Sequence, residues 1–144
     1  MTGSDGLIGK LLLDAWRDSP TYEPTGLARK PGPYTDVLGD IADFEVIRPY
    51  FDGIDAVVHM AATSAVGSTW AQVLPSNLIG TYNVFEAARQ AGVEQVVFAS
   101  SNHAIGTNET ANQPQLWEID DPRMWDEHAE VRPDSLYGVS KVYG

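Results

Sequence analysis

The chain is 144 residues long and carries 20 acidic against 9 basic side chains, which gives a formal net charge of −11. This length fits a single domain spanning residues 1–144. The negative charge argues against binding to a nucleic acid backbone, which needs basic patches. An acidic surface with few lysines suits a high-salt cytoplasm, but an ordinary acidic bacterial protein has the same character, so the charge leaves a halophilic origin open.

The chain contains no cysteine, which excludes a disulfide framework, a thiolate nucleophile and a cysteine-bound zinc. No apolar run is long enough to cross a membrane, and no secretory signal is visible in the first residues. We therefore expect a cytoplasmic protein with no membrane partner.

Helical and extended patterns alternate along the first third of the chain. Apolar side chains at helical spacing predict a helix that starts at Leu7 and stops near 18–20. Residues 22–29 read as a short strand interrupted by a proline, and 35–39 read as a second brief strand. Helical spacing returns in 41–51.

Two strongly apolar runs mark the rest of the chain. Residues 55–62 and 94–101 are typical of strands buried on both faces. A helix is predicted between them over 75–92, with proline in its first turn and glycine just past its end. Residues 102–134 read as an irregular functional loop, and 135–144 begin a further helix. The alternation predicts an α/β domain with a parallel sheet.

The first residues, "TGSDGLIG", contain Gly3, Gly6 and Gly9 directly before the predicted first helix. Small residues at this spacing allow a tight turn whose backbone N–H groups approach a pyrophosphate, and the helix N-terminus adds a partial positive charge. Glycines also punctuate ordinary loops, which is the alternative reading. A turn of this kind normally follows a strand, but here only Met1 and Thr2 precede it.

Tyr137 and Lys141 are four residues apart and would share one face of a helix. An ammonium group close to a phenol favours the phenolate, which can then take a proton from an alcohol while hydride leaves its carbon. Ser100 and Ser101 end the strand predicted over 94–101, at the carboxyl edge where open α/β sheets bind ligands. Alternatively, Tyr137 packs against the sheet, Lys141 is solvated, and the serines satisfy local backbone groups.

In this order the motifs resemble the extended short-chain dehydrogenase/reductase family, also called the NAD-dependent epimerase/dehydratase family. The matching stretches are "TGSDGLIG", "LGDI", "HMAA", "NLIGTYNV", "FASSNHAIG" and "YGVSK", and together they cover nearly the whole chain. The resemblance implies a Rossmann-like, doubly wound parallel sheet and an NAD(P)-binding domain. The sheet would be partial, because the family's first strand and its C-terminal substrate region have no counterpart here.

The resemblance also implies roles for individual residues. Ser101, Tyr137 and Lys141 would be catalytic: the serine orients the substrate oxygen, the tyrosine carries the proton, and the lysine lowers the tyrosine pKa and holds the nicotinamide ribose. The cofactor-binding residues would be Gly3, Gly6, Leu7, Ile8, Gly9, Arg29, Asp40, Ile41, Ala61, Ala62, Asn77, Tyr137 and Lys141. For Asn77 the alternative reading is a polar residue at a helix N-terminus.

The stretches "FASSNHAIG" and "RPDSLYGVSK" narrow the resemblance to a branch of sugar dehydrogenases that includes uronate dehydrogenases. Members of this branch oxidise the anomeric carbon of an aldose or hexuronate to a lactone. The branch implies a small-molecule sugar substrate touched by Ser64, Asn102 and His103. A nucleotide-sugar epimerase or dehydratase is the alternative. Three scattered histidines without ligand spacing predict no metal site.

The cofactor type is left open as NAD(P). Arg29 and Lys30 after the second predicted strand favour the extra phosphate of NADP, whereas the sugar dehydrogenase branch favours NAD. The missing first strand is central in such a sheet, and its loss would leave backbone groups unpaired at about 1–3 kcal/mol each. The chain could therefore also be a non-catalytic dinucleotide-binding or assembly fragment. In either case we expect a homo-oligomer.

Overall fold

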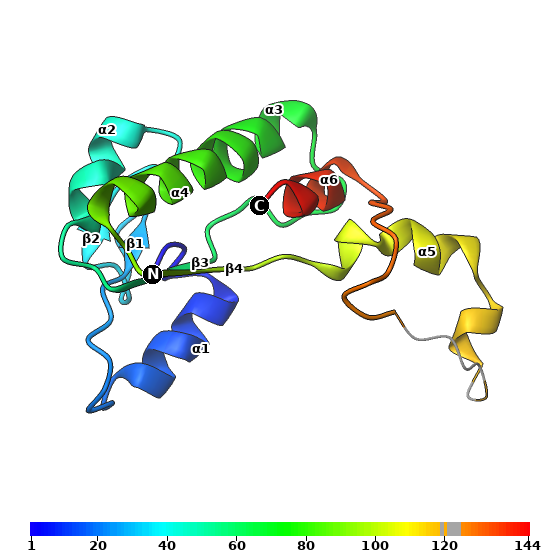
Figure 1. Ribbon diagram of the computed structural model, residues 1–144, viewed down its shortest axis with the longest axis horizontal. Helices are drawn as coiled ribbons and strands as arrows, with labels where there is room; N and C mark the ends of the chain where they lie inside the picture. Colours follow the sequence, from blue (N-terminus) through cyan, green and yellow to red (C-terminus); the bar gives the residue numbers. More distant parts are fainter. Residues whose placement is uncertain (119, 121–124) are drawn as a thin grey trace.

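The computed structural model describes residues 1–118, 120 and 125–144, and Figure 1 shows its elements in order along the chain. The strands are short and the helices alternate with them, as the sequence predicts. The elements are α1 (Leu7–Trp16), β1 (Leu27–Ala28), β2 (Val37–Leu38), α2 (Phe44–Ile47) followed by a 3₁₀ turn (Arg48–Phe51), β3 (Ala56–His59), α3 (Trp70–Val73), a π-helical segment (Leu74–Ile79), α4 (Gly80–Ala91), β4 (Gln95–Phe98), α5 (Gly106–Ala111) and α6 (Leu136–Tyr143). Two further 3₁₀ turns lie at Asn102–Ala104 and Gln115–Trp117.

The sheet consists of two parallel strand pairs. In one pair β1 lies beside β2, and in the other β3 lies beside β4, with His59 opposite Phe98 at its end. The predicted strands over 22–29 and 35–39 shorten to two residues each, because β1 has only a single residue to pair with on its inner side.

That single residue is Thr2, which bridges both strand pairs in parallel orientation. Its N–H donates to the carbonyl of Val58 at 3.0 Å, and its own carbonyl accepts from the N–H of Met60 at 3.2 Å. On the other side the N–H of Leu27 donates to the carbonyl of Met1 at 2.8 Å. The central position that the sequence predicts to be empty is therefore occupied at its carboxyl end, and the order across the sheet is β2, β1, Thr2, β3, β4.

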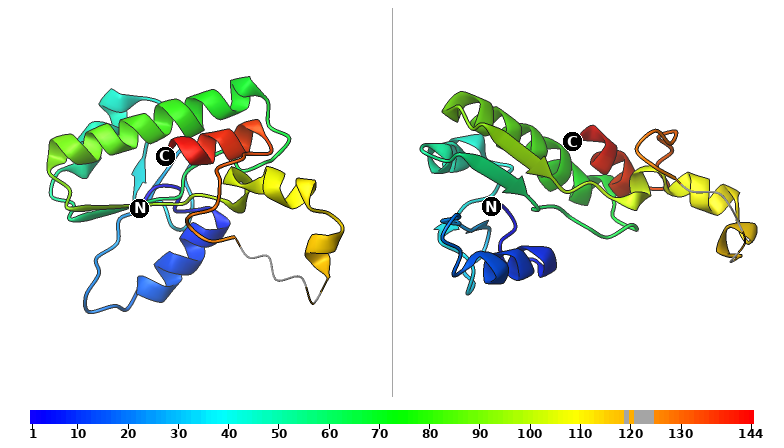
Figure 2. Two further views of the ribbon diagram at one scale, coloured as in Figure 1. Left: turned by 45° about the vertical axis from the view of Figure 1, so that its right-hand side comes forward. Right: turned by 60° about the horizontal axis from the view of Figure 1, so that its bottom comes forward.

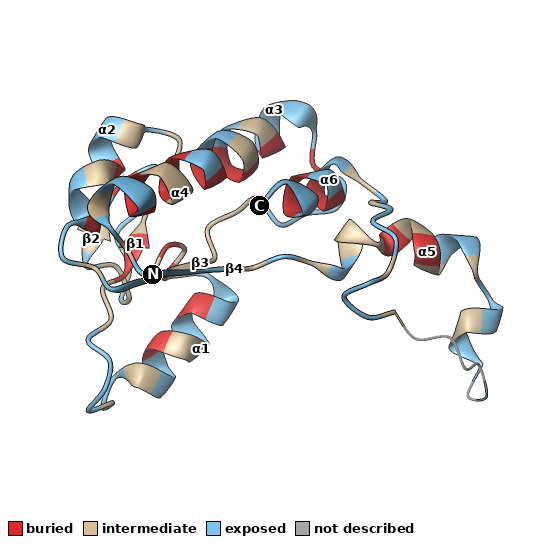
Figure 3. Ribbon diagram, viewed as in Figure 1, coloured by how far each residue is buried: buried red, intermediate tan, exposed pale blue. Residues whose placement is uncertain are grey.

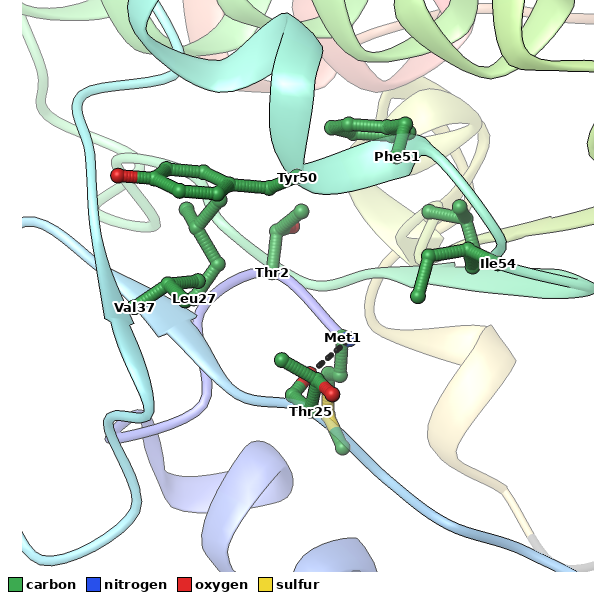
Figure 4. Close-up of a pocket in the computed structure, with 9 residues that line it drawn as sticks. Met1, Thr2, Thr25, Leu27, Val37, Tyr50, Phe51 and Ile54 are labelled. Atoms are coloured by element: carbon green, nitrogen blue, oxygen red, sulfur yellow. Dashed lines mark hydrogen bonds between the residues drawn. The ribbon is translucent and has the colours of Figure 1, made fainter.

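An apolar pocket lies beside this bridge and marks where a longer central strand would run between β1 and β3 (Figure 4). Its walls include Leu27, Phe51, Ile54 and Val57. The α-amino group of Met1 closes one end by donating to the carbonyl of Thr25 at 2.6 Å, and burial lowers the pKa of this amino group.

Helices cover both faces of the sheet. Figures 1 and 2 show α1 on one face, and α2, α4 and α6 on the opposite face. Figure 3 shows that the buried residues of α4 line its inward side. The core between these layers consists of Leu27, Ile41, Ile47, Phe51, Val57, Val84, Ala87 and Ala88. No helix within the described residues is both long and apolar enough to cross a membrane.

The structure corrects the prediction that 94–101 forms a strand buried on both faces. In β4 the side chains of Val96 and Val97 are 37% and 47% exposed. The reason is position: among the residues that the structure describes, β4 is the last strand on its side of the sheet. An apolar run therefore indicated a strand correctly without indicating how many neighbours cover it.

The helix predicted over 75–92 starts earlier than expected, because α3, the π-helical segment and α4 form one rod (Figure 1). The rod begins after Thr69, whose N–H donates to Gln72 Oε1 at 2.9 Å in a capping box. Pro75 therefore lies within the rod, in the π-helical segment, and not in a first turn. The predicted end is confirmed: Gly92 has φ +75° and its N–H donates to the carbonyl of Ala88.

The segment 102–134 is less irregular than predicted, since it contains α5 and two 3₁₀ turns. Residues 119 and 121–124 of this predicted loop lie outside the described part of the chain.

Candidate functional site

The glycine-rich turn connects Thr2 to α1 and lies against the loop that follows β3. Gly3 has φ +72°, and a Cβ at this position would lie 2.7 Å from the backbone nitrogen of Ala61. A Cβ at Gly9 would lie 2.7 Å from the carbonyl oxygen of Ser4, so α1 packs directly on the turn. No side chain caps the N-terminus of α1 at Gly6. Its first backbone N–H groups are thus available to an anion.

An open cleft of about 530 Å³ lies beside this turn. Six of the residues predicted to bind a cofactor line it: Gly3, Gly6, Arg29, Ile41, Ala61 and Ala62. The other lining residues are Asp5, Leu27, Ala28, Gly39 and Ser76. Gly9 is buried against the turn itself, whereas Leu7 and Ile8 on α1 are 81% and 55% exposed.

Two charged side chains face each other at the β1–β2 end of the cleft. Arg29 Nη1 lies 4.0 Å from Asp40 Oδ2, and both side chains are largely exposed. An ion pair of this kind contributes little to stability. Arg29, which suits a 2′-phosphate, therefore lines the cleft, whereas the Asp40 carboxylate, which suits ribose hydroxyls, lies beside Arg29 and does not line the cleft.

Asp5 is a lining residue that sequence reasoning missed. Its Oδ2 accepts a hydrogen bond from the hydroxyl of Thr35, and its Oδ1 is buried without a hydrogen-bond partner within the described residues. Gly32 leaves room for this carboxylate, since a Cβ there would overlap it. The only sequence signal was its place between two glycines of the turn.

Asn77 connects the cleft to the C-terminal helix. Its Nδ2 donates to the carbonyl of Thr63 at 2.9 Å and to Ser140 Oγ on α6 at 2.9 Å. Its Oδ1 accepts from the N–H of Thr63 at 2.7 Å and from the hydroxyl of Ser76 at 2.9 Å. The alternative reading of Asn77 as a helix N-terminal residue is wrong, because the helical rod begins at Trp70.

Tyr137 and Lys141 are both buried on the same side of α6, as their spacing predicts. Lys141 Nζ donates to the carbonyl of Ala99 at 2.8 Å and lies 4.8 Å and 5.8 Å from the ring centroids of Phe98 and Tyr137. Burial lowers the pKa of Lys141. Ser100 Oγ donates to the carbonyl of Lys141 at 3.0 Å, so α6 is fixed to the end of β4.

The residues predicted to touch a sugar lie on two loops at the carboxyl ends of β3 and β4. Ser101 Oγ caps a 3₁₀ turn by accepting from the N–H of His103 at 3.2 Å, and it donates to Asn102 Oδ1 at 3.3 Å. The His103 ring stands edge-on to Tyr137, with 5.8 Å between ring centroids. Ser64 and Asn102 are exposed. The structure therefore brings Ser101, Asn102 and His103 next to α6, and leaves Ser64 on the separate loop after β3.

The site as a whole joins an anion-accepting turn to a buried tyrosine–lysine pair at one edge of a parallel sheet. In the part of the chain that the structure describes, no group of histidine and carboxylate side chains could hold a metal ion. Residues 1–144 match the NAD dependent epimerase/dehydratase family.

The chain belongs to that family. A uronate dehydrogenase of Pseudomonas putida is 34% identical, in an alignment that covers 100% of this chain and 51% of that protein. An NAD-dependent glucose-6-phosphate dehydrogenase of Haloferax volcanii is 35% identical, with 100% and 58% covered. The crystal structure of a uronate dehydrogenase variant from Agrobacterium tumefaciens complexed with NAD is 33% identical, has a TM-score of 0.79, and is matched over 99% of this chain and 51% of that one.

These likenesses show that the fold is Rossmann-like, in agreement with the sequence prediction. The chain spans about half the length of the relatives that it matches.

Proposed function

We propose that this chain supplies the cofactor-binding half, and the catalytic Ser101, Tyr137 and Lys141, of an NAD(P)-dependent oxidoreductase that oxidises C1 of a sugar or sugar acid to a lactone. The observation that supports it most is that Asn77 joins α6 to the loop after β3, against which the glycine turn lies. The likeness to uronate and glucose-6-phosphate dehydrogenases supports the substrate class.

The cleft fits a dinucleotide. The positions of Gly3 and Gly9 are those where a Cβ would collide with backbone, so the turn stays close enough for its N–H groups to meet a pyrophosphate. Ala61 and Ala62, which lie next to the turn, also line the cleft and leave space there because their side chains are small. A bound nicotinamide dinucleotide would supply the hydride acceptor.

The residues of α6 and the β4 loop would handle the proton. In the proposed reaction the C1 hydroxyl is held by Ser101 and loses its proton to the Tyr137 oxygen while the C1–H bond breaks, which leaves a C1 carbonyl. The ammonium of Lys141 beside the Tyr137 ring favours negative charge on that oxygen. The sheltered position of both side chains strengthens this electrostatic effect.

The test is an absorbance assay of reduced cofactor with glucuronate, galacturonate or glucose 6-phosphate and either NAD or NADP. Turnover is expected with at least one pair. The variant Tyr137→Phe should lose about 10²- to 10⁴-fold in kcat and keep its affinity for the dinucleotide. Tyr143→Phe is the matched control, because Tyr143 is an exposed tyrosine on the same helix. A folded sample that turns over none of the pairs would contradict the proposal.

A second candidate function is dinucleotide binding without turnover, in an assembly that another chain completes. The cleft beside the glycine turn, which Tyr137 and Lys141 do not line, favours it. Dinucleotide binding by calorimetry together with absence of turnover would support this alternative, and measurement of the mass in solution would test the expected homo-oligomer.

A further inference from the structure

A carboxylate outside the predicted catalytic residues is bonded to the histidine beside Tyr137. Asp134 Oδ2 lies 2.6 Å from His103 Nδ1. The two side chains are 19% and 30% exposed, so each is partly shielded from solvent. They are 31 residues apart in sequence, and each belongs to a different side of the site: His103 to the loop after β4 and Asp134 to the segment that enters α6.

The backbone around this pair is shaped to receive it. A Cβ at Gly106 would overlap Asp134 Oδ2, and a Cβ at Gly138 would overlap the carbonyl oxygen of His103. Both glycines have ordinary negative φ, so the need for glycine is one of space. The loop after β4 can thus approach α6 closely because Gly106 and Gly138 have no side chains. This close approach brings Asp134 into contact with His103.

The second oxygen of the carboxylate is also engaged. Asp134 Oδ1 accepts from the Ser135 hydroxyl at 2.8 Å, and Ser135 Oγ caps α6 by accepting from the N–H of Gly138 at 2.9 Å. Burial raises the pKa of the Asp134 carboxyl, but hydrogen bonds from His103 and Ser135 outweigh it and hold this pKa below its usual value. The group is therefore ionised at neutral pH, when it can only accept hydrogen bonds.

An accepting partner at Nδ1 decides how the imidazole carries its proton. Nδ1 must be the donor, so in the neutral ring Nε2 keeps its lone pair. Within residues 1–118, 120 and 125–144, Nε2 of His103 has no hydrogen-bond partner. The ring stands edge-on to Tyr137, next to the phenol proposed to act on the sugar.

We propose that Asp134 is a positioning residue that holds His103 in the Nδ1–H tautomer, so that Nε2 accepts a hydrogen bond from a sugar hydroxyl beside Tyr137. The choice of a sugar hydroxyl as the ligand of Nε2 rests on the function proposed above. The pairing itself concerns residues of this chain alone, and it can be measured without turnover.

The test is a long-range ¹H–¹⁵N correlation spectrum of the histidine rings in the intact chain, recorded across a pH titration. For wild type we expect His103 with hydrogen on Nδ1. The variant Asp134→Asn should weaken that preference, because the amide that replaces the carboxylate can donate to Nδ1 as well as accept from it. Glu130→Gln is the charge-matched control on the same segment, and it should leave His103 unchanged.

The other titratable groups on this side of α6 are Tyr137, which packs against His103, and Lys141. Both are unchanged in wild type and in the two variants. A wild-type spectrum with hydrogen on Nε2 would overturn the inference without any variant. So would an Asp134→Asn ring spectrum that matches wild type.

Kinetics give a second readout. Asp134→Asn should raise KM for the sugar about tenfold, which corresponds to one weakened hydrogen bond, with kcat and dinucleotide affinity close to wild type. A fall in kcat with unchanged KM would count against positioning. Failure of the proposed function would be visible as no turnover by wild type, whereas failure of this inference would be visible in the ring spectra.

Discussion

Acid should destabilise the folded chain through one buried histidine. His59 ends β3 and is 1% exposed. Its Nδ1 lies 2.6 Å from Thr2 Oγ1 and its Nε2 lies 3.2 Å from Thr81 Oγ1. Thr2 Oγ1 also accepts from the N–H of Ala61 at 3.2 Å. A neutral His59 ring can accept a hydrogen bond from one of these two hydroxyls and donate to the other, whereas a doubly protonated ring can accept from neither.

The size of the effect follows from the two pKa values. Burial, with a smaller contribution from the charge of Lys141, lowers the pKa of His59 from 6.5 to about 4. Between these values the unfolded chain binds a proton that the folded chain does not, so the free energy of unfolding falls as the pH falls. The His59 contribution is fully present above pH 6.5 and amounts to about 3 kcal/mol. That is a large share of the roughly 5–15 kcal/mol typical of a domain.

The assay is urea unfolding between pH 7 and pH 4 for wild type and His59→Gln. Carboxylates titrate in both proteins, so the difference between the two curves isolates His59. The stability advantage of wild type should shrink by about 3 kcal/mol over this range. His128→Gln, which replaces an exposed histidine, should follow wild type.

Parallel pH curves for wild type and His59→Gln would refute the reasoning. Should the variant not fold, an NMR titration of wild type decides the matter, because a His59 ring that titrates above pH 6 in the folded state contradicts burial as a neutral base.

Two further predictions concern the cleft. Gly9→Ala places a methyl group against the carbonyl oxygens of the turn, including Gly3, and should lower stability by about 1–3 kcal/mol and weaken dinucleotide binding. At Gly67 nothing lies within 4 Å, so thermal melting of Gly67→Ala should match wild type, and equal melting of both variants would contradict the packing argument. Asn77→Ala leaves the N–H of Thr63 without its partner and should cost about 1–3 kcal/mol in urea unfolding. An unchanged midpoint would show that Asn77 does not hold the cleft to α6.

Much of the fold could be predicted because its signals are local. The helical spacing of apolar side chains located α1, a continuous apolar run located β3, and Gly92 marked the end of the helix before it. The start of the long rod was missed because Pro75 is a strong local signal, and it outweighed the capping pair further upstream. The exposure of β4 was missed because apolar composition does not reveal where a sheet ends.

The site residues also fall into those that local sequence signals predicted and those that they did not. Tyr137 and Lys141 are one helical turn apart, so their shared buried side followed from spacing. The pairing of His103 with Asp134 could not be predicted from spacing. The segment between them has little periodicity, and two glycines allow the close approach that brings the side chains together. Asp5 entered the cleft through the conformation of a turn, which composition alone does not specify.

The bridge at Thr2 also bears on how the molecule assembles. Its hydrogen-bonded neighbours are Leu27 on one side and β3 on the other, and its hydroxyl meets a ring 57 positions further along the chain. Two nested loops must close before this residue has both partners, and closing loops of that length is slow because chain entropy is lost before contacts compensate for it. A nascent chain therefore has no binding cleft until β3 has emerged, and a ligand of that cleft can bind only after both loops have closed.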